Sequence, residues 1–563
     1  MGSRALSPGT PFRVRWLGSV RYRDALALQH GLYRRTDDHL LLLEHPHVFT
    51  LGVRADTAHL LVDPDAVGAD LERADRGGDI TYHGPGQVVG YPVRTVPGKR
   101  GGGMADTVAY VRSVEALLID VLADVGLTDT GRLAEYPGVW VAPESDHPRK
   151  IAAIGVKLTR GRSLHGFALN VDPDLAWFEH IVPCGIADKA VTSLAAEGFD
   201  VPMAEVVDRL AQRGAAQWAT GPVRRADVAW RVRSGDLSPF TRGEGPGQPA
   251  GRPDSPFVDV PSPRVRSRLR EAGVGQGVDR RDRKPEWMRV KLDHGPAYRE
   301  VRSILREQNL VTVCEEAGCP NISECWNDGT ATFMLNGARC TRACGFCLVD
   351  TRRPEPLDPT EPARVAAAVR RMGLRHVVLT AVARDDLPDG GASGFVATIA
   401  AIRADDARTS VEVLISDGKG DPAALDPIFA ARPDVLNHNI ETVPRLQRAV
   451  RPAAGYARSL AVLARADEQG LTTKSSIIVG MGEGVDEVIE TMADLAAVGV
   501  DIVTIGQYLR PTSHHVPVSR WWTPDEFVEL KRVGERELGL AHVEAGPLTR
   551  SSYHARQAAA SVS

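Results

Sequence analysis

Apolar positions divide the chain into two regions with different patterns. In the first region, short apolar runs typical of strands, such as 39–43 and 138–141, occur with stretches of helical period such as 107–122. In the second region, strand-like and helix-like segments follow one another in regular order. The expected strands are 375–380, 411–415, 435–440, 474–480 and 501–509, and the expected helices are 361–372, 394–403, 456–468 and 485–496.

The two patterns predict two fold classes. The mixed pattern of the first region predicts an α+β domain, and the regular alternation of the second predicts an α/β domain with a parallel sheet, closed into a full or partial barrel. Between 222 and 282 the periodicity is lost, and only 265–273 indicates a short helix. We therefore expect domains at 1–221 and 283–563, joined by a flexible linker at 222–282.

Composition narrows the functional classes. A chain of 563 residues is too long for one core, and 43% hydrophobic with 25% charged residues is typical of globular proteins. A net charge of -4 gives no electrostatic reason to expect nucleic acid. No apolar run approaches the roughly 20 residues of a membrane span, and we find no secretory signal. We expect a cytoplasmic enzyme in which clustered cysteines bind metal rather than form disulfides.

Six of the seven cysteines lie between 314 and 347, in two groups of three. The second group, Cys340, Cys344 and Cys347, has the spacing C-x3-C-x2-C and places three thiolates on one short loop. Such a loop can surround an iron-sulfur cubane and leaves one of its four irons without a protein ligand. Structural zinc requires four ligands, and no fourth has a matching spacing. Zinc and inert thiols remain the alternatives at this point.

The C-x3-C-x2-C motif, with Phe346 before its last cysteine and a barrel pattern downstream, resembles the signature of the radical S-adenosylmethionine (SAM) enzymes. The resemblance implies a 4Fe-4S cluster at Cys340, Cys344 and Cys347, whose open iron binds SAM. It also implies an electron donor, because reductive cleavage of SAM produces the 5′-deoxyadenosyl radical in that superfamily.

The first group has the spacing C-x4-C-x5-C. Together with R-S-S-Y-H at 550–554 and R-D-D-L-P-D-G-G at 384–391, it resembles lipoyl synthase over residues 283–555. That resemblance implies an auxiliary 4Fe-4S cluster, the sulfur donor, held by Cys314, Cys319, Cys325 and Ser552, with Ser551 as the alternative serine. A hard serine oxygen is a weak iron ligand beside thiolates, which fits a cluster that is dismantled.

The second region departs from the lipoyl synthase pattern at five places, none of them an implied cluster ligand. Ser416 and Gly418 stand where the family usually has proline and an aromatic residue, and Ser476 replaces a glycine. Ser513 replaces a basic residue, and 544–545 reads Glu-Ala instead of a small residue and serine. Activity is still expected. The alternative is a different or inactive radical SAM enzyme that inserts sulfur.

Cys184 is the isolated cysteine of the first region. A lone cysteine is more often a small buried side chain than a nucleophile. Here, however, Pro183 and Gly185 flank it and indicate a turn that presents the thiol. Because an unshifted thiol is mostly protonated at neutral pH, it needs a neighbouring cation or base, and Lys150 is the candidate.

The first region resembles lipoyl(octanoyl) transferase over residues 12–218. The resemblance rests on R-G-G-D-I-T-Y-H-G-P-G-Q at 76–87, K-I-A-A-I-G at 150–155, H-G-F-A-L-N at 165–170 and P-C-G at 183–185. It implies a fold like that of the biotin and lipoate protein ligases. It also implies a Cys184 nucleophile, Lys150 as proton shuttle and His83 as a residue that orients or polarises the site. The implied acyl-binding residues are Arg76, Gly77, Gly78, Asp79, Ile80, Thr81, Tyr82, His83, Ala153, Ile154, Gly155, Gly166, Phe167 and Ala168.

The two resemblances describe consecutive steps. The first implies transfer of octanoyl from octanoyl acyl carrier protein to a lysine of a lipoyl domain, in 2-oxoacid dehydrogenase complexes or the glycine cleavage H protein. The second implies insertion of sulfur at carbons 6 and 8 of that octanoyl group. Together they predict a bifunctional enzyme of lipoate biosynthesis that uses two 4Fe-4S clusters and SAM. A biotin- or lipoate-ligase-like activity is the alternative for the first region, but it needs an ATP-binding glycine-rich segment and no catalytic cysteine.

Overall fold

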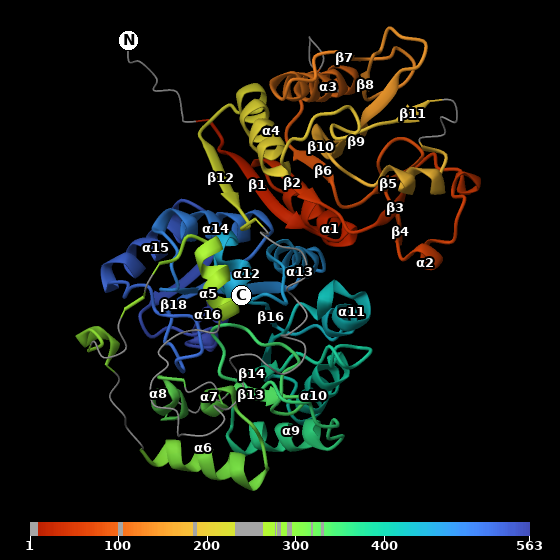
Figure 1. The fold of residues 1–563 in the computed structure, drawn as a ribbon. Coiled ribbons are helices and arrows are strands. Elements are labelled where there is room, and N and C mark those ends of the chain that lie inside the picture. Colours follow the sequence, from red (N-terminus) through yellow and green to blue (C-terminus); the bar gives the residue numbers. More distant parts are fainter. Residues whose placement is uncertain are drawn as a thin grey trace. The chain divides into compact units, whose positions relative to one another are not determined.

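The computed structural model describes residues 9–98, 105–183, 189–230, 263–275, 277–278, 283–289, 295–316, 319–327 and 332–562 (Figure 1). The chain divides into two compact units, Met1–Trp230 and Arg231–Ser563. Each unit has its own sheet and its own hydrophobic core.

The described part of the first unit contains a mixed nine-stranded sheet. Its order is β12-β1-β2-β6-β10-β9-β8-β7, and β11 pairs with β9 off this path. The strands are β1 (Phe12–Ser19), β2 (Asp38–Glu44), β6 (Gln87–Val93), β7 (Thr130–Gly131), β8 (Val139–Val141), β9 (Arg149–Thr159), β10 (Arg162–Asn170), β11 (Ala190–Val191) and β12 (Val223–Asp227).

A second, smaller sheet has the order β4-β3-β5, and β5 carries part of the predicted glycine-rich motif. Its strands are β3 (Val48–Leu51), β4 (Asp70–Arg73) and β5 (Ile80–His83). The short helix α2 (Pro64–Val67) precedes β4. Side chains alternate along β5, so that one face of this strand can line a site while the other packs in a core.

Three helices cover the large sheet of the first unit. Asp106 caps the start of helix α3 (Thr107–Asp124), because its carboxylate accepts a hydrogen bond from the Ala109 amide. Helix α3 packs with α4 (Met203–Trp218) over the main core of this unit, whereas α1 (Tyr22–Tyr33) contacts β6 and β10 and contributes no residue to that core. The α+β prediction for the first region is confirmed.

The second unit is built on seven parallel strands that follow one another in chain order. They are β13 (Thr332–Leu335), β14 (His376–Ala381), β15 (Ser410–Leu414), β16 (Val435–Asn437), β17 (Thr472–Val479), β18 (Ile502–Gln507) and β19 (His542–Gly546). In the part of the chain that the structure describes, β13 and β19 do not pair, so the sheet is a partial barrel, as predicted. This order places the carboxyl ends of neighbouring strands at one rim.

Helices connect successive strands of this sheet. They are α9 (Glu361–Arg371), α10 (Ala392–Asp405), α11 (Pro422–Ala430), α12 (Gln447–Val450), α13 (Tyr456–Glu468), α14 (Val485–Ala497) and α15 (Pro524–Arg536). Apolar residues of the strands and helices form one core cluster, in which Val377, Leu379, Phe395 and Leu436 are almost completely buried. Helix α15 begins at Thr523, which forms a capping box with Glu526.

Short helices surround the cysteine-rich entry to the second unit. They are α6 (Pro296–Glu307), α7 (Val313–Glu316) and α8 (Ile322–Asn327), and α16 (Ala555–Ala560) follows β19 near the end of the chain. Buried Tyr298 of α6 packs against buried Trp326 of α8, with ring centroids 4.8 Å apart. The apolar side of α6 therefore fixes the helix that carries Cys325.

The predicted strands and helices of the second region agree with the structure, apart from their ends. The largest difference is at 435–440, where β16 ends at Asn437. His438 leaves the strand: its Nδ1 lies 3.0 Å from the carbonyl oxygen of Ile415 and its Nε2 lies 3.0 Å from the Ser459 hydroxyl. Glu441 then adopts a positive φ of 67°. Tertiary polar contacts thus end this strand three residues earlier than the sequence predicted.

The structure differs from the predicted linker, 222–282, at both ends. Strand β12 pairs in parallel with β1, so residues 223–227 belong to the first sheet. At the other end, helix α5 (Pro263–Glu271) is the predicted short helix, and its Glu271 forms an ion pair with Arg448 of α12. The middle of the predicted linker, 231–262, lies outside the described residues.

No helix among the described residues is both long enough and apolar enough to cross a membrane.

Candidate active sites

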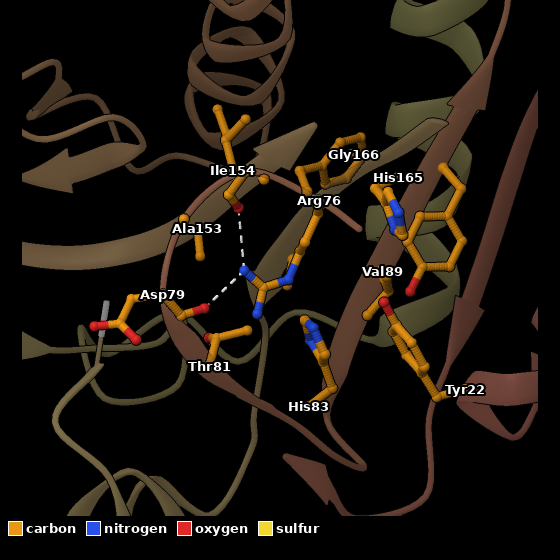
Figure 2. A pocket seen from close by; sticks show the side chains of 16 residues that line it. Tyr22, Arg76, Asp79, Thr81, His83, Val89, Ala153, Ile154, His165 and Gly166 are labelled. Atoms are coloured by element: carbon orange, nitrogen blue, oxygen red, sulfur yellow. Dashed lines mark hydrogen bonds between the residues drawn. The ribbon is translucent and has the colours of Figure 1, made fainter. Parts of the chain in front are cut away.

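A pocket in the first unit joins three of the segments that the sequence predicted. It is lined by residues of the glycine-rich motif and of the facing strands β9 and β10, in Figure 2 with Ala153 and Ile154 on one side and Tyr22, His83 and His165 on the other. The lining residues are Tyr22, Arg76, Gly77, Gly78, Asp79, Thr81, His83, Val89, Tyr91, Ala153, Ile154, Gly155, His165, Gly166, Phe167 and Ala168.

Two of the predicted acyl-binding residues, Ile80 and Tyr82, do not line the pocket. Both lie on β5, where Thr81 and His83 face the pocket. Ile80 and Tyr82 point to the opposite face and pack in a separate core with Phe49. The reason is the two-residue period of a strand, which divides the motif between the pocket and the core.

Arg76 organises the glycine-rich loop. One terminal guanidinium nitrogen donates to the carbonyl oxygens of Asp79 and Gly77, at 2.9 and 3.2 Å. The other donates to the carbonyl and hydroxyl oxygens of Thr50, both at 2.7 Å. Gly155 leaves room for this side chain, because a Cβ there would lie 3.0 Å from Arg76 Cδ. Arg76 therefore shapes the pocket wall through backbone contacts.

His83 lines the pocket, and buried His45 packs beside it with ring centroids 5.7 Å apart. His45 Nδ1 lies 2.7 Å from the carbonyl oxygen of Val20, and its Nε2 accepts from the Tyr91 hydroxyl at 2.7 Å. Burial lowers the pKa of His45 to about 4. Burial also holds the pKa of His83 well below its usual value, with a further contribution from neighbouring His45. Both imidazoles are therefore neutral at pH 7.

His165 and Asp75 form a second polar group at the pocket. His165 Nε2 donates to Asp75 at 2.6 Å, and Lys157 donates to the other carboxylate oxygen. Burial lowers the pKa of His165, while the hydrogen bond from His165 lowers the pKa of Asp75. At neutral pH this group presents a neutral imidazole beside an ionised carboxylate.

The buried histidines predict acid sensitivity of the first unit. The unfolded chain protonates His45 near pH 6.5, whereas the folded protein does not until about pH 4. Protons therefore favour the unfolded state in this window, and the free energy of unfolding should fall by roughly 2 kcal/mol for this histidine between pH 7 and pH 5. Pulse proteolysis of the full chain in urea, with quantification of the surviving first-unit fragment, measures this free energy at each pH.

A matched pair of variants isolates this effect. His45→Gln should reduce the pH dependence of the urea midpoint, whereas His147→Gln, at an exposed position, should leave it unchanged. An unaltered pH dependence in His45→Gln would contradict the prediction.

Lys150 lies on β9, the strand whose residues 153–155 line the pocket. The lysine is buried, and its Nζ lies 4.8 Å from the centre of the Trp140 ring. A bulge between β8 and β9 shifts the register beside Trp140 and Lys150. Such a bulge re-aims the side chains next to it. Lys150 is thus a cation held against an aromatic face at the end of the strand that forms the pocket wall.

Cys184 lies outside the described residues, but the chain on both sides of it is anchored beside the site. Before it, the Val182 amide donates to the carbonyl oxygen of His59 at 2.8 Å, and His59 contacts pocket residue Asp79. After it, the Thr192 amide donates to the carbonyl oxygen of Lys150 at 2.9 Å. The described neighbours of Cys184 therefore connect the pocket to Lys150.

The three cysteines of the C-x3-C-x2-C loop are brought together in the second unit. Burial raises the pKa of Cys344 to about 12 and that of Cys347 still further, and the neighbouring thiols add to both shifts. These thiols need a cationic group to become thiolates, and a cluster supplies one. No three His, Cys, Asp or Glu side chains of the described chain converge on a single metal ion. A cubane needs only thiols placed around it, and this loop fits that requirement.

Contacts among the described residues place the C-terminal R-S-S-Y turn against the first cysteine group. The Asn321 side chain donates to the carbonyl oxygen of Leu548 at 2.7 Å, and the Tyr553 hydroxyl donates to Glu324 at 3.0 Å. Burial raises the pKa of Cys319, and the nearby Arg550 guanidinium opposes that shift. Ser551 and Ser552 lie in this same turn. Cys314, the first cysteine of this group, lies on α7.

Gly506 at the end of β18 allows this turn to approach the sheet. A Cβ at position 506 would lie 1.9 Å from the carbonyl oxygen of Thr549, which is not sterically possible. The glycine is therefore required for the contact between β18 and the R-S-S-Y turn.

Comparisons with known proteins identify the second unit. Residues 261–319 match the N-terminal domain of lipoyl synthase of the radical SAM family, and residues 337–495 match the radical SAM superfamily. A lipoyl synthase of Rubrobacter xylanophilus is 57% identical over 276 residues, which are 49% of this chain and 86% of that protein. Through its second unit, the chain belongs to the lipoyl synthase family. A lipoyl synthase of Mycobacterium avium is 55% identical over 282 residues, 49% of this chain and 92% of that protein.

The first unit matches a second family. Residues 21–214 match the lipoyl protein ligase A/B catalytic domain, which confirms the resemblance of the first region. Among solved structures, a lipoate-protein ligase A bound with ATP aligns with TM-score 0.33 and 21% identity over 39% of this chain and 90% of that chain. Methylornithine synthase aligns with TM-score 0.32 and 13% identity over 50% of this chain and 74% of that chain. By the family matches, the chain is a ligase- or transferase-like domain fused to a lipoyl synthase.

Lipoyl synthases use SAM and 4Fe-4S clusters, and the cysteine groups of the lipoyl synthase unit agree with both. The structure explains two departures from the family pattern. Gly418 has a φ of +51°, and a Cβ there would lie 2.9 Å from Ala424 Cβ, so an aromatic residue does not fit this loop. Glu544 lies 3.3 Å from His554 and so links β19 to the R-S-S-Y turn. Nothing in the structure explains Ser476 or Ser513.

Several pocket and loop residues gave no sufficient signal in the sequence. Tyr22, Val89 and Tyr91 line the pocket from α1 and β6, which carry no chemical motif. His165 belongs to a recognised motif, but nothing local indicated its contact with Asp75. In the lipoyl synthase unit the missed residue is Arg342, between Cys340 and Cys344. Its signal was its position within the cysteine motif.

Proposed function

We propose that the chain is a bifunctional enzyme of lipoate biosynthesis. The first unit transfers an octanoyl group from octanoyl acyl carrier protein to a lysine of a lipoyl domain, and the lipoyl synthase unit inserts sulfur at carbons 6 and 8. The observation that supports the first step is the pocket beside β9: Lys150 lies on that strand, and the amide of Thr192, which follows Cys184 in the chain, donates to the Lys150 carbonyl oxygen.

In the proposed transfer, the Cys184 sulfur attacks the thioester carbonyl carbon. The carbon–sulfur bond to the carrier breaks, and the carrier leaves as a thiol with a proton supplied by Lys150. The lysine amine of the acceptor then attacks the acyl-enzyme and gives its proton to Lys150, which is neutral after the first step. The bond between the acyl carbon and Cys184 breaks, and Cys184 leaves as the thiolate. Buried Lys150 stabilises the thiolate in both steps. Neutral His83 is suited to orient the carbonyl, because it carries no charge that would compete with Lys150.

The pocket is proposed to bind the acyl chain. Ala153, Gly155 and Ala168 leave space between β9 and β10, and Val89 and Phe167 supply apolar surface. Burial of an eight-carbon chain contributes roughly 5 kcal/mol at about 0.8 kcal/mol per methylene. That energy is sufficient to discriminate octanoyl from much shorter chains.

A transferase is favoured over an ATP-dependent ligase for the first unit. A ligase activates a free acid with ATP and requires no enzyme nucleophile, so neither Cys184 nor a lysine beside it would have a role. The support for a transferase is the presence of Cys184 in a P-C-G turn, together with a buried lysine, Lys150, on the strand that forms the pocket wall.

In the lipoyl synthase unit, Cys340, Cys344 and Cys347 are proposed to hold the SAM-binding cluster. Cys314, Cys319, Cys325 and Ser552 are proposed to hold the auxiliary cluster. Of these, Ser552 lies in the turn whose approach to the sheet Gly506 allows. When bound, the first cluster with SAM would supply the radical that removes hydrogen from the octanoyl chain, and the auxiliary cluster would supply the sulfur that replaces it. Because this chemistry needs reduced thiols and an electron donor, we propose a reducing, cytoplasmic location.

Anaerobic reconstitution tests the whole proposal. After incorporation of iron and sulfide, the full chain is incubated with apo lipoyl domain, octanoyl acyl carrier protein, SAM and a reductant. Mass spectrometry of the lipoyl domain should show octanoyl addition first and the dithiolane later. A parallel reaction with octanoate and ATP in place of the carrier should give no addition. Addition only in that second reaction would show a ligase instead.

A further inference from the structure

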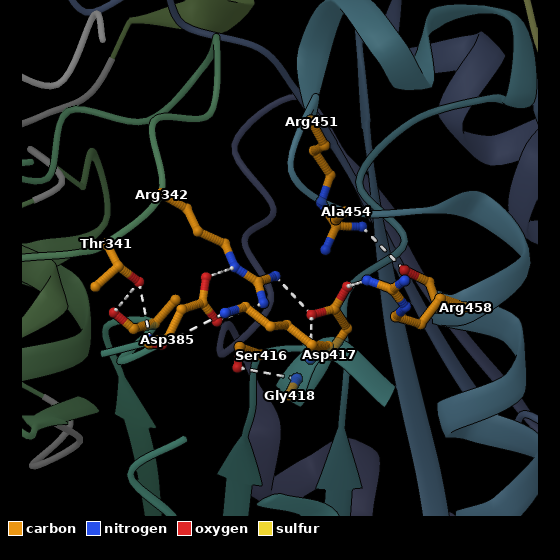
Figure 3. Close-up of polar contacts among 12 residues, drawn as sticks. Thr341, Arg342, Asp385, Ser416, Asp417, Gly418, Arg451, Ala454 and Arg458 are labelled. Atoms are coloured by element: carbon orange, nitrogen blue, oxygen red, sulfur yellow. Dashed lines mark hydrogen bonds and ion pairs between the residues drawn. The ribbon is translucent and has the colours of Figure 1, made fainter. Parts of the chain in front are cut away.

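Arg342 lies inside the cysteine loop, two residues after Cys340, and its side chain is only 6% exposed. Its Nε and Nη2 donate to the two carboxylate oxygens of Asp385, at 2.7 and 2.8 Å. Its Nη1 lies 2.6 Å from Asp417 Oδ1 (Figure 3). All three guanidinium nitrogens are therefore engaged by two carboxylates.

The two carboxylates follow neighbouring strands of the barrel. Asp385 comes after β14, and its amide donates to the Thr341 hydroxyl at 3.1 Å. Thr341 in turn donates from its amide and its hydroxyl to the carbonyl oxygen of Ala383, at 3.0 and 2.9 Å. The loop residues before Cys344 are thus fixed to the end of β14 at several points.

Asp417 follows β15 and is completely buried. Its Oδ1 also accepts from the Lys419 amide at 3.0 Å, and its Oδ2 lies 3.6 Å from the Arg458 guanidinium of α13 (Figure 3). The carboxylate that receives Arg342 is therefore itself held by a second element. Asp417 thus links the cysteine loop, the end of β15 and α13.

The second half of the cysteine loop is anchored differently. The Gly345 amide donates to the carbonyl oxygen of Val450 at 2.8 Å, and the Val516 amide donates to that of Gly345 at 2.9 Å. His515 Nε2 lies 2.9 Å from the carbonyl oxygen of Cys347. Backbone contacts and the His515 side chain thus position the half that contains Cys347. The half next to Cys340 is held by the backbone amides of Cys340 and Thr341 and, in addition, by the side chains of Thr341 and Arg342.

Buried ion pairs are poor sources of stability, because removing the charges from water offsets most of their attraction. Their value is geometric: a planar guanidinium that binds one carboxylate through two nitrogens fixes direction as well as distance. A lysine at the same position would retain the positive charge but could not bind one carboxylate through two nitrogens held in a plane.

We propose that Arg342 is a positioning residue, whose pairs with Asp385 and Asp417 fix the loop of Cys340, Cys344 and Cys347 on the ends of β14 and β15. The loop thereby holds its cluster in a set orientation toward the rim where SAM and the octanoyl chain meet. This inference rests on family membership of the lipoyl synthase unit and not on the activity of the first unit.

The test compares Arg342→Lys with Arg352→Lys, a control in which an exposed arginine ten positions along the chain pairs with Asp350. Both variants are reconstituted in the full chain and assayed with a lipoyl domain that already carries octanoyl. We expect Arg342→Lys to retain iron but to show an altered electron paramagnetic resonance signal of the SAM-binding cluster. We also expect it to form more 5′-deoxyadenosine per sulfur inserted. Sulfur insertion should slow by about 10- to 100-fold, as expected for a displacement of about 1 Å.

An unaltered signal and unaltered 5′-deoxyadenosine ratio in Arg342→Lys would overturn the proposal. If that variant does not bind iron, Asp385→Asn decides the question, because it removes the more exposed carboxylate and leaves the pair with Asp417. A partial change of the same signal in Asp385→Asn would support positioning. A wild-type signal there would assign Arg342 a role in folding alone and overturn the proposal.

Discussion

Replacement of Cys184 by serine is expected to lower octanoyl transfer by at least about 10³-fold, because a serine hydroxyl without a strong base is a much weaker nucleophile than a thiolate. Intact-protein mass spectrometry gives a direct measurement. With octanoyl acyl carrier protein and no acceptor, the wild-type chain should gain one octanoyl group and Cys184→Ser should gain none.

The lipoyl synthase unit provides the control within the same chain. Sulfur insertion into a lipoyl domain that already carries octanoyl should be equal in the wild-type chain and in Cys184→Ser. Lys150→Met should also reduce acyl-enzyme formation, because the buried cation next to Trp140 is lost while most of the packing remains. Wild-type transfer by Cys184→Ser would exclude the acyl-enzyme and favour a ligase.

Alanine substitutions in the two cysteine groups are expected to stop sulfur insertion at different stages. Cys340→Ala should lose about half of the bound iron and essentially all cleavage of SAM, because only two thiolates remain for that cluster. Cys319→Ala should also lose about half of the iron but should still cleave SAM. Iron analysis and quantification of 5′-deoxyadenosine distinguish the two variants.

Octanoyl transfer should be unchanged in both cysteine variants and reports that the first unit is folded. If Cys319→Ala still formed the dithiolane, the auxiliary cluster would not be the sulfur donor. If Cys340→Ala still cleaved SAM, the assignment of the two groups would be reversed.

The sequence predicted the second unit more completely than the first. The five strands and four helices that the sequence predicted are local segments with a clear period, and sequential βα order leaves little choice of topology. The barrel elements β13, β19, α11, α12 and α15 were not predicted. The end of β16 was not predicted, because His438 leaves the strand to hydrogen-bond with Ile415 and Ser459, which are distant in sequence. Contacts of this kind have no local pattern.

The candidate sites show the same limit. Cysteine spacing and motifs indicated the metal-binding groups and most of the pocket. Tyr22 and Tyr91 reach the pocket only because α1 and β6 meet there, and this meeting depends on the tertiary fold. Ile80 and Tyr82, by contrast, were assignable to the core from the alternation along a four-residue strand. Arg342 was visible in the motif, but its two partners follow strands that lie side by side only in the folded barrel.

Strand β12 has a consequence for the order in which the protein folds and for separating its halves. It pairs with β1, and the Trp16 amide donates to Asp227 across 211 positions of sequence. On the ribosome, the edge of β1 therefore remains uncovered until nearly the whole first unit has been synthesised, whereas the barrel can grow strand by strand. A gene for the first half alone that stops at residue 221 lacks β12 and would leave the edge of β1 open to pairing with other chains. Extending that gene through Trp230 restores the pairing of β12 with β1.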